Sequence, residues 1–447
     1  MIDAEKSPHW ELDRLYVRES EALNRDLKSL DDMSQAFKGH RARLMEKTPV
    51  TIEEFGKIIK EFDAMTVLGQ RISAFAQLSF ASDTSDQKAL AFLAKVDEIM
   101  AKLFNETLFF ELWWKDLPDG EALPLVEAFS QYAYFLSRLR AFRKHTLSEP
   151  EEKVINLKDL TGSESMIKLY DTITNAFRYE SPDASAPLDR LLTREELTVF
   201  FRSHIPELRA KAYQELYRIY SRDANVLGQI YLVLVRDWHT ENVDLRKYPS
   251  PRSVRDKSND IAFETVDSLL KVCRTKGPEV FGRYFKKKAQ HLGLKTLRRY
   301  DLYAPLLPPE EKYTFSQGLA EVEAAFKAFD PRFASLAMQI PKEAHLSAEI
   351  RPGKQSGAFC ASTVPGEVPF VLMSYNGNRQ DLFTLAHELG HAVHSLLASH
   401  LNIFNFHSAL PMAETASTMA EMLLASYLKK KAVSKETIDD LNFHLLD

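Results

Sequence analysis

The stretch His387-Glu388-Leu389-Gly390-His391 decides how this chain is interpreted, because its H-E-x-x-H pattern is typical of the zinc-binding helix of metallopeptidases. One helical turn takes about 3.6 residues, so imidazoles four positions apart project from the same face of a helix. His387 and His391 can therefore direct two ring nitrogens at one metal ion. Glu388 is predicted to lie beside that ion as the group that carries protons.

The residues around the motif favour a helix over a chance match. Asn376-Gly377-Asn378 predicts a turn, and Asp381 is predicted to be the N-cap that accepts a hydrogen bond from the amide of Thr384. The three histidines of this helix are expected to lie off its packing face. Apolar residues at helical spacing predict that packing face: Leu385, Leu389, Val393 and Leu396.

A third protein ligand for the metal is expected on another element, and Glu414 is the preferred candidate. It lies in a segment predicted to be a helix that begins after Pro411. Glu421 follows two turns later on the same face, so one carboxylate can bind the ion while the other hydrogen-bonds the second nitrogen of a ligand histidine. Without the upstream motif, two solvated helix carboxylates would be the ordinary interpretation.

The chain resembles the oligoendopeptidase F branch of the thimet-oligopeptidase-like zinc peptidases. By this resemblance His387, His391 and Glu414 would bind one Zn²⁺ per chain, and Glu388 would be the catalytic acid and base. The stretches that carry the resemblance are TLAHELGHAVH at 384–394, PFVLMSY at 369–375, ETAST at 414–418, RPGK at 351–354, GAFC at 357–360 and YDLYAPL at 300–306.

The resemblance implies a two-lobed, mainly α, zincin-type metallopeptidase fold with a small β-sheet next to the metal-binding helix. It also implies a zinc-dependent endopeptidase that cleaves short oligopeptides and excludes folded proteins by size. A non-catalytic metal- or peptide-binding helical module is the alternative. Family members carry a further helical segment after the glutamate ligand, whereas residues 438–446 read as an amphipathic helix without a stop signal. The catalytic domain is therefore expected to lack its C-terminal part, which leaves the activity of this chain open.

Helical periodicity dominates the rest of the sequence. It predicts an N-terminal helical lobe over residues 1–185 and the catalytic domain over 186–447, joined by the turn-rich stretch SPDASAP at 181–187. Further helices are predicted at 263–275 and 278–292. Three strands are predicted directly before the metal helix, at 344–350, 358–363 and 368–375.

Four residues near the motif are predicted to contact a peptide substrate. An exposed sheet edge can pair with an extended peptide, and Gly357 and Ala358 lie at the start of the second strand. A purely structural sheet with a glycine turn is an equal alternative. His394 shares the ligand stripe but lies about 10 Å along the helix from His387, so it is not assigned as a ligand. His407 could reach the cleft from its loop, with an ordinary surface histidine as the alternative.

Composition limits the remaining function classes. The 58 Lys and Arg residues against 63 Asp and Glu give a net charge of −5, which favours neither nucleic acid nor an anionic membrane as a partner. The lysine run at 286–288 is expected to be solvated. No apolar stretch of about 18 residues occurs, which predicts a cytoplasmic protein. Cys273 and Cys360 are expected to be free, buried thiols, and the sequence does not indicate an oligomeric state.

Overall fold

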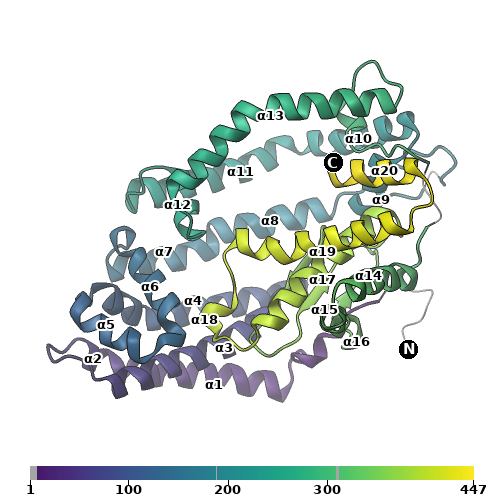
Figure 1. Cartoon of the computed structure of the whole chain (residues 1–447). Helices are drawn as coiled ribbons and strands as arrows, with labels where there is room; N and C mark the ends of the chain where they lie inside the picture. The colour runs from purple at the N-terminus through teal and green to yellow at the C-terminus, as the bar shows by residue number, and fades with distance from the viewer. Residues whose placement is uncertain (1–7, 188, 309–311, 447) are drawn as a thin grey trace.

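In the computed structural model the chain is mainly helical, as predicted, and one three-stranded sheet lies among its described residues (Figure 1). The structure describes residues 8–187, 189–308 and 312–446. The N-terminal helices are α1 (Glu21–Lys38), α2 (His40–Leu44), α3 (Ile52–Ser82), α4 (Gln87–Asp116), α5 (Asp119–Ala128), α6 (Ala133–Ala141), α7 (Glu149–Thr161) and α8 (Ser163–Asn175).

The N-terminal helices pack around an aromatic core. Phe55 from α3 stacks on Trp114 from α4 with ring centroids 5.3 Å apart, and both side chains are fully buried. Phe110 lies 5.1 Å from Phe62 in the same core. Aromatic pairs of this kind stabilise a fold by about 0.5–1.5 kcal/mol beyond the burial of their area. These residues therefore serve packing and do not form a ligand site.

A second group of helices follows the turn-rich stretch. Pro278 lies inside α13, so the two helices predicted at 263–275 and 278–292 are one. A proline removes one backbone hydrogen bond, but residues 271–276 are exposed and water can satisfy the carbonyl that loses its partner. The helices of this group are α9 (Arg194–Val199), α10 (Pro206–Arg222), α11 (Ala224–His239), α12 (Pro251–Ser258) and α13 (Phe263–His291), with short 3₁₀ turns η4 (Phe200–Arg202) and η6 (Arg299–Asp301).

The last part of the chain contains the sheet and the helices that carry the metal motif. All three predicted strands are present, although each is shorter than predicted. Helices α17 and α19 lie side by side near the centre of the molecule (Figure 1). The elements are α14 (Phe315–Phe329), α15 (Pro331–Ala337), α16 (Gln339–Lys342), β1 (Leu346–Ser347), β2 (Phe359–Ala361), β3 (Phe370–Leu372), α17 (Arg379–Ala398), α18 (Ile403–Phe406), α19 (Leu410–Lys431) and α20 (Lys435–Leu446).

Strand β3 joins two hydrophobic cores. The strand order is β1-β3-β2, with β1 parallel and β2 antiparallel to β3. Successive side chains of a strand point to opposite faces. Phe370 and Leu372 accordingly pack into the core of the N-terminal helices, whereas Val371 and Met373 pack into the core formed with α14, α17 and α19. The sheet thus fixes the metal helix against the rest of the molecule.

Two predictions about polar and thiol side chains were wrong. Lys288 is completely buried, and its ammonium group donates to the carbonyl of Leu302, so only the first two lysines of the run at 286–288 are exposed. Cys273 and Cys360 are both free, but Cys273 is exposed and Cys360 is only half-buried. Tertiary packing, which the local sequence does not encode, decides which side of a helix is covered.

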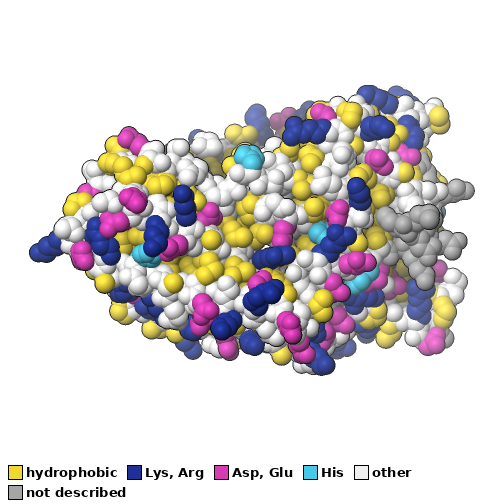
Figure 2. Space-filling view, turned by 90° about the horizontal axis from the view of Figure 1, so that it is seen from below, with side chains coloured by type: hydrophobic (Ala, Val, Ile, Leu, Met, Phe, Trp, Pro, Cys, Tyr) yellow, Lys and Arg dark blue, Asp and Glu magenta, His cyan; other side chains and the backbone are white. Residues whose placement is uncertain are grey.

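On the face of the molecule seen from below, Lys and Arg side chains are interleaved with Asp and Glu side chains (Figure 2).

Within the described residues, none of the helices has the length and apolar character that crossing a lipid bilayer requires.

Candidate metal centre

Helix α17 presents the H-E-x-x-H motif, and its start differs from the prediction. Asn378, not Asp381, is the N-cap, and its side chain accepts from the amide of Asp381 at 3.1 Å. Asp381 completes a capping box because its carboxylate accepts from the amides of Asn376 at 2.7 Å and Asn378 at 3.1 Å. Asn376, Asn378 and Asp381 can each cap a helix, so composition alone did not select the correct one.

The packing face of α17 is as predicted for its central residues. Leu385, Leu389 and Val393 are buried with Leu382 against α14, α15 and α19. His387 and His391 keep 27% and 20% of their side-chain surface exposed, so both rings remain accessible on the other side.

Gly390 allows α19 to approach α17 closely. A Cβ atom at this position would lie 2.7 Å from the carbonyl oxygen of Ala416 and 2.8 Å from the Cα of Ser417. Such distances are far below van der Waals contact, so only glycine fits without moving the helices apart. The glycine inside the motif therefore determines how near the side chains of α19 come to the histidines.

The structure brings His387, His391 and Glu414 together. The two Nε2 atoms are 3.2 Å apart, and Oε2 of Glu414 lies 3.3 Å from Nε2 of His387 and 3.6 Å from Nε2 of His391. Ser417 donates to the same oxygen of Glu414 at 2.8 Å, which orients the carboxylate. Three possible ligand atoms thus converge on one point from two helices.

This donor set fits a zinc ion. Ligand atoms about 2.0–2.1 Å from a tetrahedral Zn²⁺ lie about 3.3 Å from one another, which is close to the three distances between these donors. Two imidazoles and one carboxylate are also the donor types of catalytic zinc sites that keep one position open. The partial exposure of all three side chains leaves room for that open position.

Glu421 lies behind His387. Its Oε1 is 2.6 Å from Nδ1 of His387. A carboxylate can only accept, so the proton is on Nδ1 and the lone pair of Nε2 points toward Glu414 and His391. The hydrogen bond with Glu421 raises the pKa of His387, whereas burial lowers the pKa of His391.

Glu388 lies beside the triad in a buried position. Only 6% of its surface is exposed. Burial raises the pKa of Glu388 to about 7, with neighbouring Glu414 and Glu421 adding to the shift and His387 opposing it. A carboxyl group with a pKa near neutrality can both accept and release a proton, as a general acid and base must.

The predicted substrate residues line two neighbouring pockets. His394, His407 and Ala358 line a pocket of about 350 Å³ around the metal triad, which we call the metal pocket. Ala358 also borders a second pocket of about 330 Å³, which we call the side pocket, and Gly357 lines only the latter. A Cβ added to Gly357 would meet open space, and its φ of +92° favours glycine.

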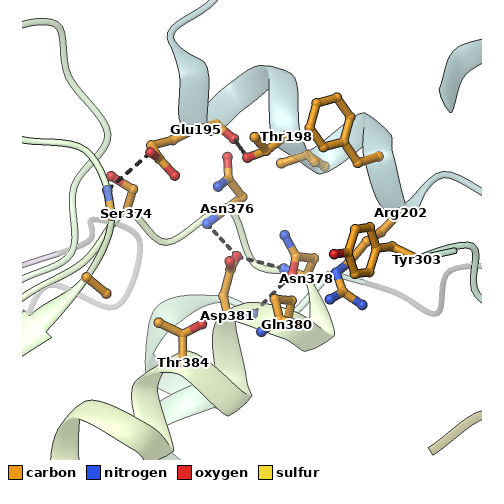
Figure 3. Close-up of a pocket in the computed structure, with 14 residues that line it drawn as sticks. Glu195, Thr198, Arg202, Tyr303, Ser374, Asn376, Asn378, Gln380, Asp381 and Thr384 are labelled. Atoms are coloured by element: carbon orange, nitrogen blue, oxygen red, sulfur yellow. Dashed lines mark hydrogen bonds between the residues drawn. The ribbon is translucent and has the colours of Figure 1, made fainter. Parts of the chain in front are cut away.

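The side pocket is lined by residues that lie far apart in the sequence. Arg202 from η4 and Tyr303 after η6 lie at one end, and Glu195 and Ser374 lie at the other (Figure 3). Asn376 and its neighbours at the start of α17 lie between them. These residues are up to about 180 positions apart in the chain, so no motif spacing links them. Tyr303 and Ser374 lie in stretches that carry the family resemblance, whereas Glu195 and Arg202 do not.

Comparison with known proteins identifies the family to which the chain belongs. Residues 199–447 match the profile of peptidase family M3, and residues 114–179 match that of Oligopeptidase F. The chain belongs to peptidase family M3. This finding confirms the resemblance to the oligoendopeptidase F branch.

Curated proteins named as oligopeptidases match along nearly the whole chain. An oligoendopeptidase F homolog of Borreliella burgdorferi is 23% identical over 447 residues, which cover 98% of this chain and 73% of that protein. The group B oligopeptidase PepB of Streptococcus agalactiae is 23% identical over 99% of this chain and 73% of its own length.

Solved structures confirm the expected two-lobed, mainly α zincin-type fold. Pz peptidase A with an inhibitor aligns with a TM-score of 0.77 at 16% identity, covering 94% of this chain and 71% of that one. Oligoendopeptidase F from Enterococcus faecium aligns with a TM-score of 0.63 at 18% identity, covering 95% of this chain and 71% of that one. The M3 chain is therefore folded like peptidases of this group.

Proposed function

We propose that this M3 peptidase is a zinc-dependent endopeptidase that cleaves short peptides. The observation that carries the proposal is the convergence of His387, His391 and Glu414 at distances of 3.2–3.6 Å, next to the buried carboxyl group of Glu388. His387, His391 and Glu414 hold one zinc ion. When bound, Zn²⁺ supplies a Lewis acid that polarises a peptide carbonyl and makes a water molecule more acidic.

Glu388 moves the protons of the reaction. Its position beside the triad lets the carboxylate take a proton from the attacking water and later deliver a proton to the leaving amine. Glu421 keeps the proton of His387 on Nδ1, so that Nε2 remains a metal ligand. The buried surroundings of Glu388 strengthen these electrostatic interactions because little water screens them.

The edge of β2 binds the peptide in this proposal. Among the described strands, β2 pairs only with β3, so its other edge can form main-chain hydrogen bonds with an extended substrate. Gly357 and Ala358 precede this edge, and His394 and His407 line the metal pocket beyond it. Main-chain recognition suits a peptidase that accepts varied short peptides.

We also propose a cytoplasmic location and the division into lobes 1–185 and 186–447.

Three proteins test the proposal together: the wild type, Glu388→Gln and Glu414→Ala. The wild type should bind one zinc per chain and cleave a quenched fluorescent peptide in a chelator-sensitive way. Glu388→Gln should retain the metal and lose cleavage, because the amide cannot carry the proton. Glu414→Ala should lose the metal and, with it, cleavage.

The outcomes of this comparison are distinct. A wild type that binds zinc and peptides without turnover would support the alternative, a non-catalytic metal- or peptide-binding helical module. A Glu414→Ala variant that keeps its full complement of zinc would contradict the ligand assignment and direct attention to Glu421.

A further inference from the structure

A third pocket, separate from the two already described, lies where the end of α13 meets η6. Its volume is about 370 Å³, and it shares no described lining residue with the metal pocket or the side pocket. No Asp or Glu occurs among the described residues that line it. We call it the basic pocket, because all four charged side chains that line it are cationic: Lys286, Lys295, Arg298 and Arg299.

Three of these four cations have no carboxylate partner. Among the described residues, no ion pair involves Lys286, Lys295 or Arg299, and all three side chains are exposed. Arg298 is paired with Asp301 at 2.8 Å, but the same carboxylate also accepts from Arg209 at 2.7 Å. The basic pocket therefore carries an excess of positive charge, which attracts an anionic ligand.

Apolar side chains complete the lining of the basic pocket. Ala289 is buried, and Phe285 keeps 39% of its surface exposed. Leu297 and Leu302 are half-buried at the same pocket. A ligand that carries an apolar group can cover these side chains, which is favourable because apolar surface leaves water. A simple inorganic anion can use only the cations.

Buried contacts hold the two walls of the basic pocket in place. Lys288 of α13 is completely buried and donates to the carbonyl of Leu302, which joins the end of the helix to the segment after η6. Asp301 is also completely buried, and its ion pair with Arg209 ties η6 to α10. A site whose walls are already ordered loses little conformational entropy when a ligand binds.

The charge of the basic pocket favours a phosphate over a carboxylate. A phosphate monoester carries about 1.5 to 2 negative charges at neutral pH and has three strong acceptor oxygens, whereas a carboxylate carries one charge on two oxygens. Arginine and lysine side chains both bind phosphate groups. Three unpaired cations beside an apolar surface thus suit a phosphate that is attached to an apolar or aromatic group.

We propose that the basic pocket binds a small organic phosphate. Lys286, Lys295 and Arg299 hold the phosphate group, and Phe285 contacts the apolar part of the ligand. This site does not depend on the proposed peptidase function, because it is separate from the metal centre. Arg299 also lies over the ring of Tyr303, 5.2 Å from its centroid, and Tyr303 lines the side pocket. The bound phosphate is therefore placed next to the side pocket.

Isothermal titration calorimetry of the full chain with three small anions tests the proposal. Phenyl phosphate combines the phosphate with an aromatic ring, inorganic phosphate lacks the ring, and benzoate has the ring but a single charge. The wild type should bind phenyl phosphate at least about tenfold more tightly than either of the other two, since a hydrogen bond to a charged group contributes about this factor.

Variants of exposed residues locate the binding site. Lys286→Gln and Lys295→Gln should each weaken phenyl phosphate binding about tenfold. Phe285→Ala should remove most of the advantage of phenyl phosphate over inorganic phosphate. Lys287→Gln is the matched control, because Lys287 is exposed in the same lysine run but does not line the basic pocket. This control should bind phenyl phosphate like the wild type.

Three results would overturn the proposal. The first is a wild type that shows no binding of phenyl phosphate at millimolar concentration. The second is equal affinity of the wild type for all three anions, and the third is equal weakening by Lys287→Gln and Lys295→Gln, which would indicate unspecific attraction to surface lysines. None of these measurements requires cleavage of a peptide, so failure of the proposed peptidase function would leave the test of the basic pocket intact.

Discussion

Glu421 controls the chemistry of His387 although it is not placed among the metal ligands. The 2.6 Å contact between its Oε1 and Nδ1 of His387 fixes the tautomer and the orientation of the ring. The same contact raises the pKa of His387 and so makes the imidazole a more basic ligand. In the proposed zinc site, a carboxylate two turns after Glu414 would therefore contribute to metal affinity indirectly.

We predict that Glu421→Gln weakens zinc binding about 10- to 100-fold, the range typical of partners that orient a ligand histidine. The amide keeps the size of the side chain but loses the charge that holds the proton on Nδ1. Competition with a chromophoric chelator measures the affinity. Glu436→Gln, which changes an exposed carboxylate at the start of α20, is the control. Equal zinc affinities of Glu421→Gln and this control would show that Glu421 does not orient His387.

At the scale of elements, the close contact between α17 and α19 brings together the residues of the proposed metal centre. Each helix alone presents only part of the donor set: two imidazoles on α17 and the carboxylates on α19. Gly390 lets the two backbones approach. A tightly packed interior has little space into which an added methyl group can move.

We predict that Gly390→Ala destabilises the protein by about 1–3 kcal/mol, the usual cost of overpacking, and weakens zinc binding because Glu414 moves away from the histidines. Urea denaturation and chelator competition measure the two effects.

Gly282→Ala on α13 is the matched control for this substitution, since a Cβ there meets no atom within 4 Å. This change should be neutral or stabilise by up to about 1 kcal/mol through helix propensity. Similar behaviour of the two alanine variants would contradict the role assigned to Gly390.

At the scale of the whole molecule, Lys354 binds backbone carbonyl groups of the sheet that joins the two hydrophobic cores. Its Nζ donates to the carbonyls of Ser347 at 3.2 Å, Glu349 at 2.9 Å and Met373 at 2.6 Å. Burial lowers the pKa of Lys354 from 10.5 to about 7. The unfolded chain thus binds more protons than the folded chain between pH 7 and about 10.5, so the free energy of unfolding should rise with pH in this window.

We predict that the wild type gains up to about 1.4 kcal/mol of stability per pH unit between pH 7 and 9 relative to Lys354→Met, which cannot titrate. Urea denaturation in excess chelator, at several pH values, measures the two slopes. Lys327→Met, at an exposed position of α14, should retain the wild-type slope. Parallel slopes for the wild type and Lys354→Met would show that Lys354 stays charged in the folded protein.

The sequence by itself determined the features that depend on short-range spacing. The four-residue interval between His387 and His391 fixes two imidazoles on one helical face. Glycine and proline turns marked out the three segments that contain the strands. Mainly helical structure and the family also followed from local patterns. The positions of Glu414 and Glu421 were anticipated because both lie on one face of a single helix.

Only the tertiary structure decided the features that depend on approach between distant segments. It selected Asn378 as the N-cap of α17, buried Lys288 and let α13 continue through Pro278. It also placed Arg202 in a pocket beside residues about 180 positions away. Periodicity reports which face of an element is apolar, but the partner of that face is set by packing energies summed over the whole chain.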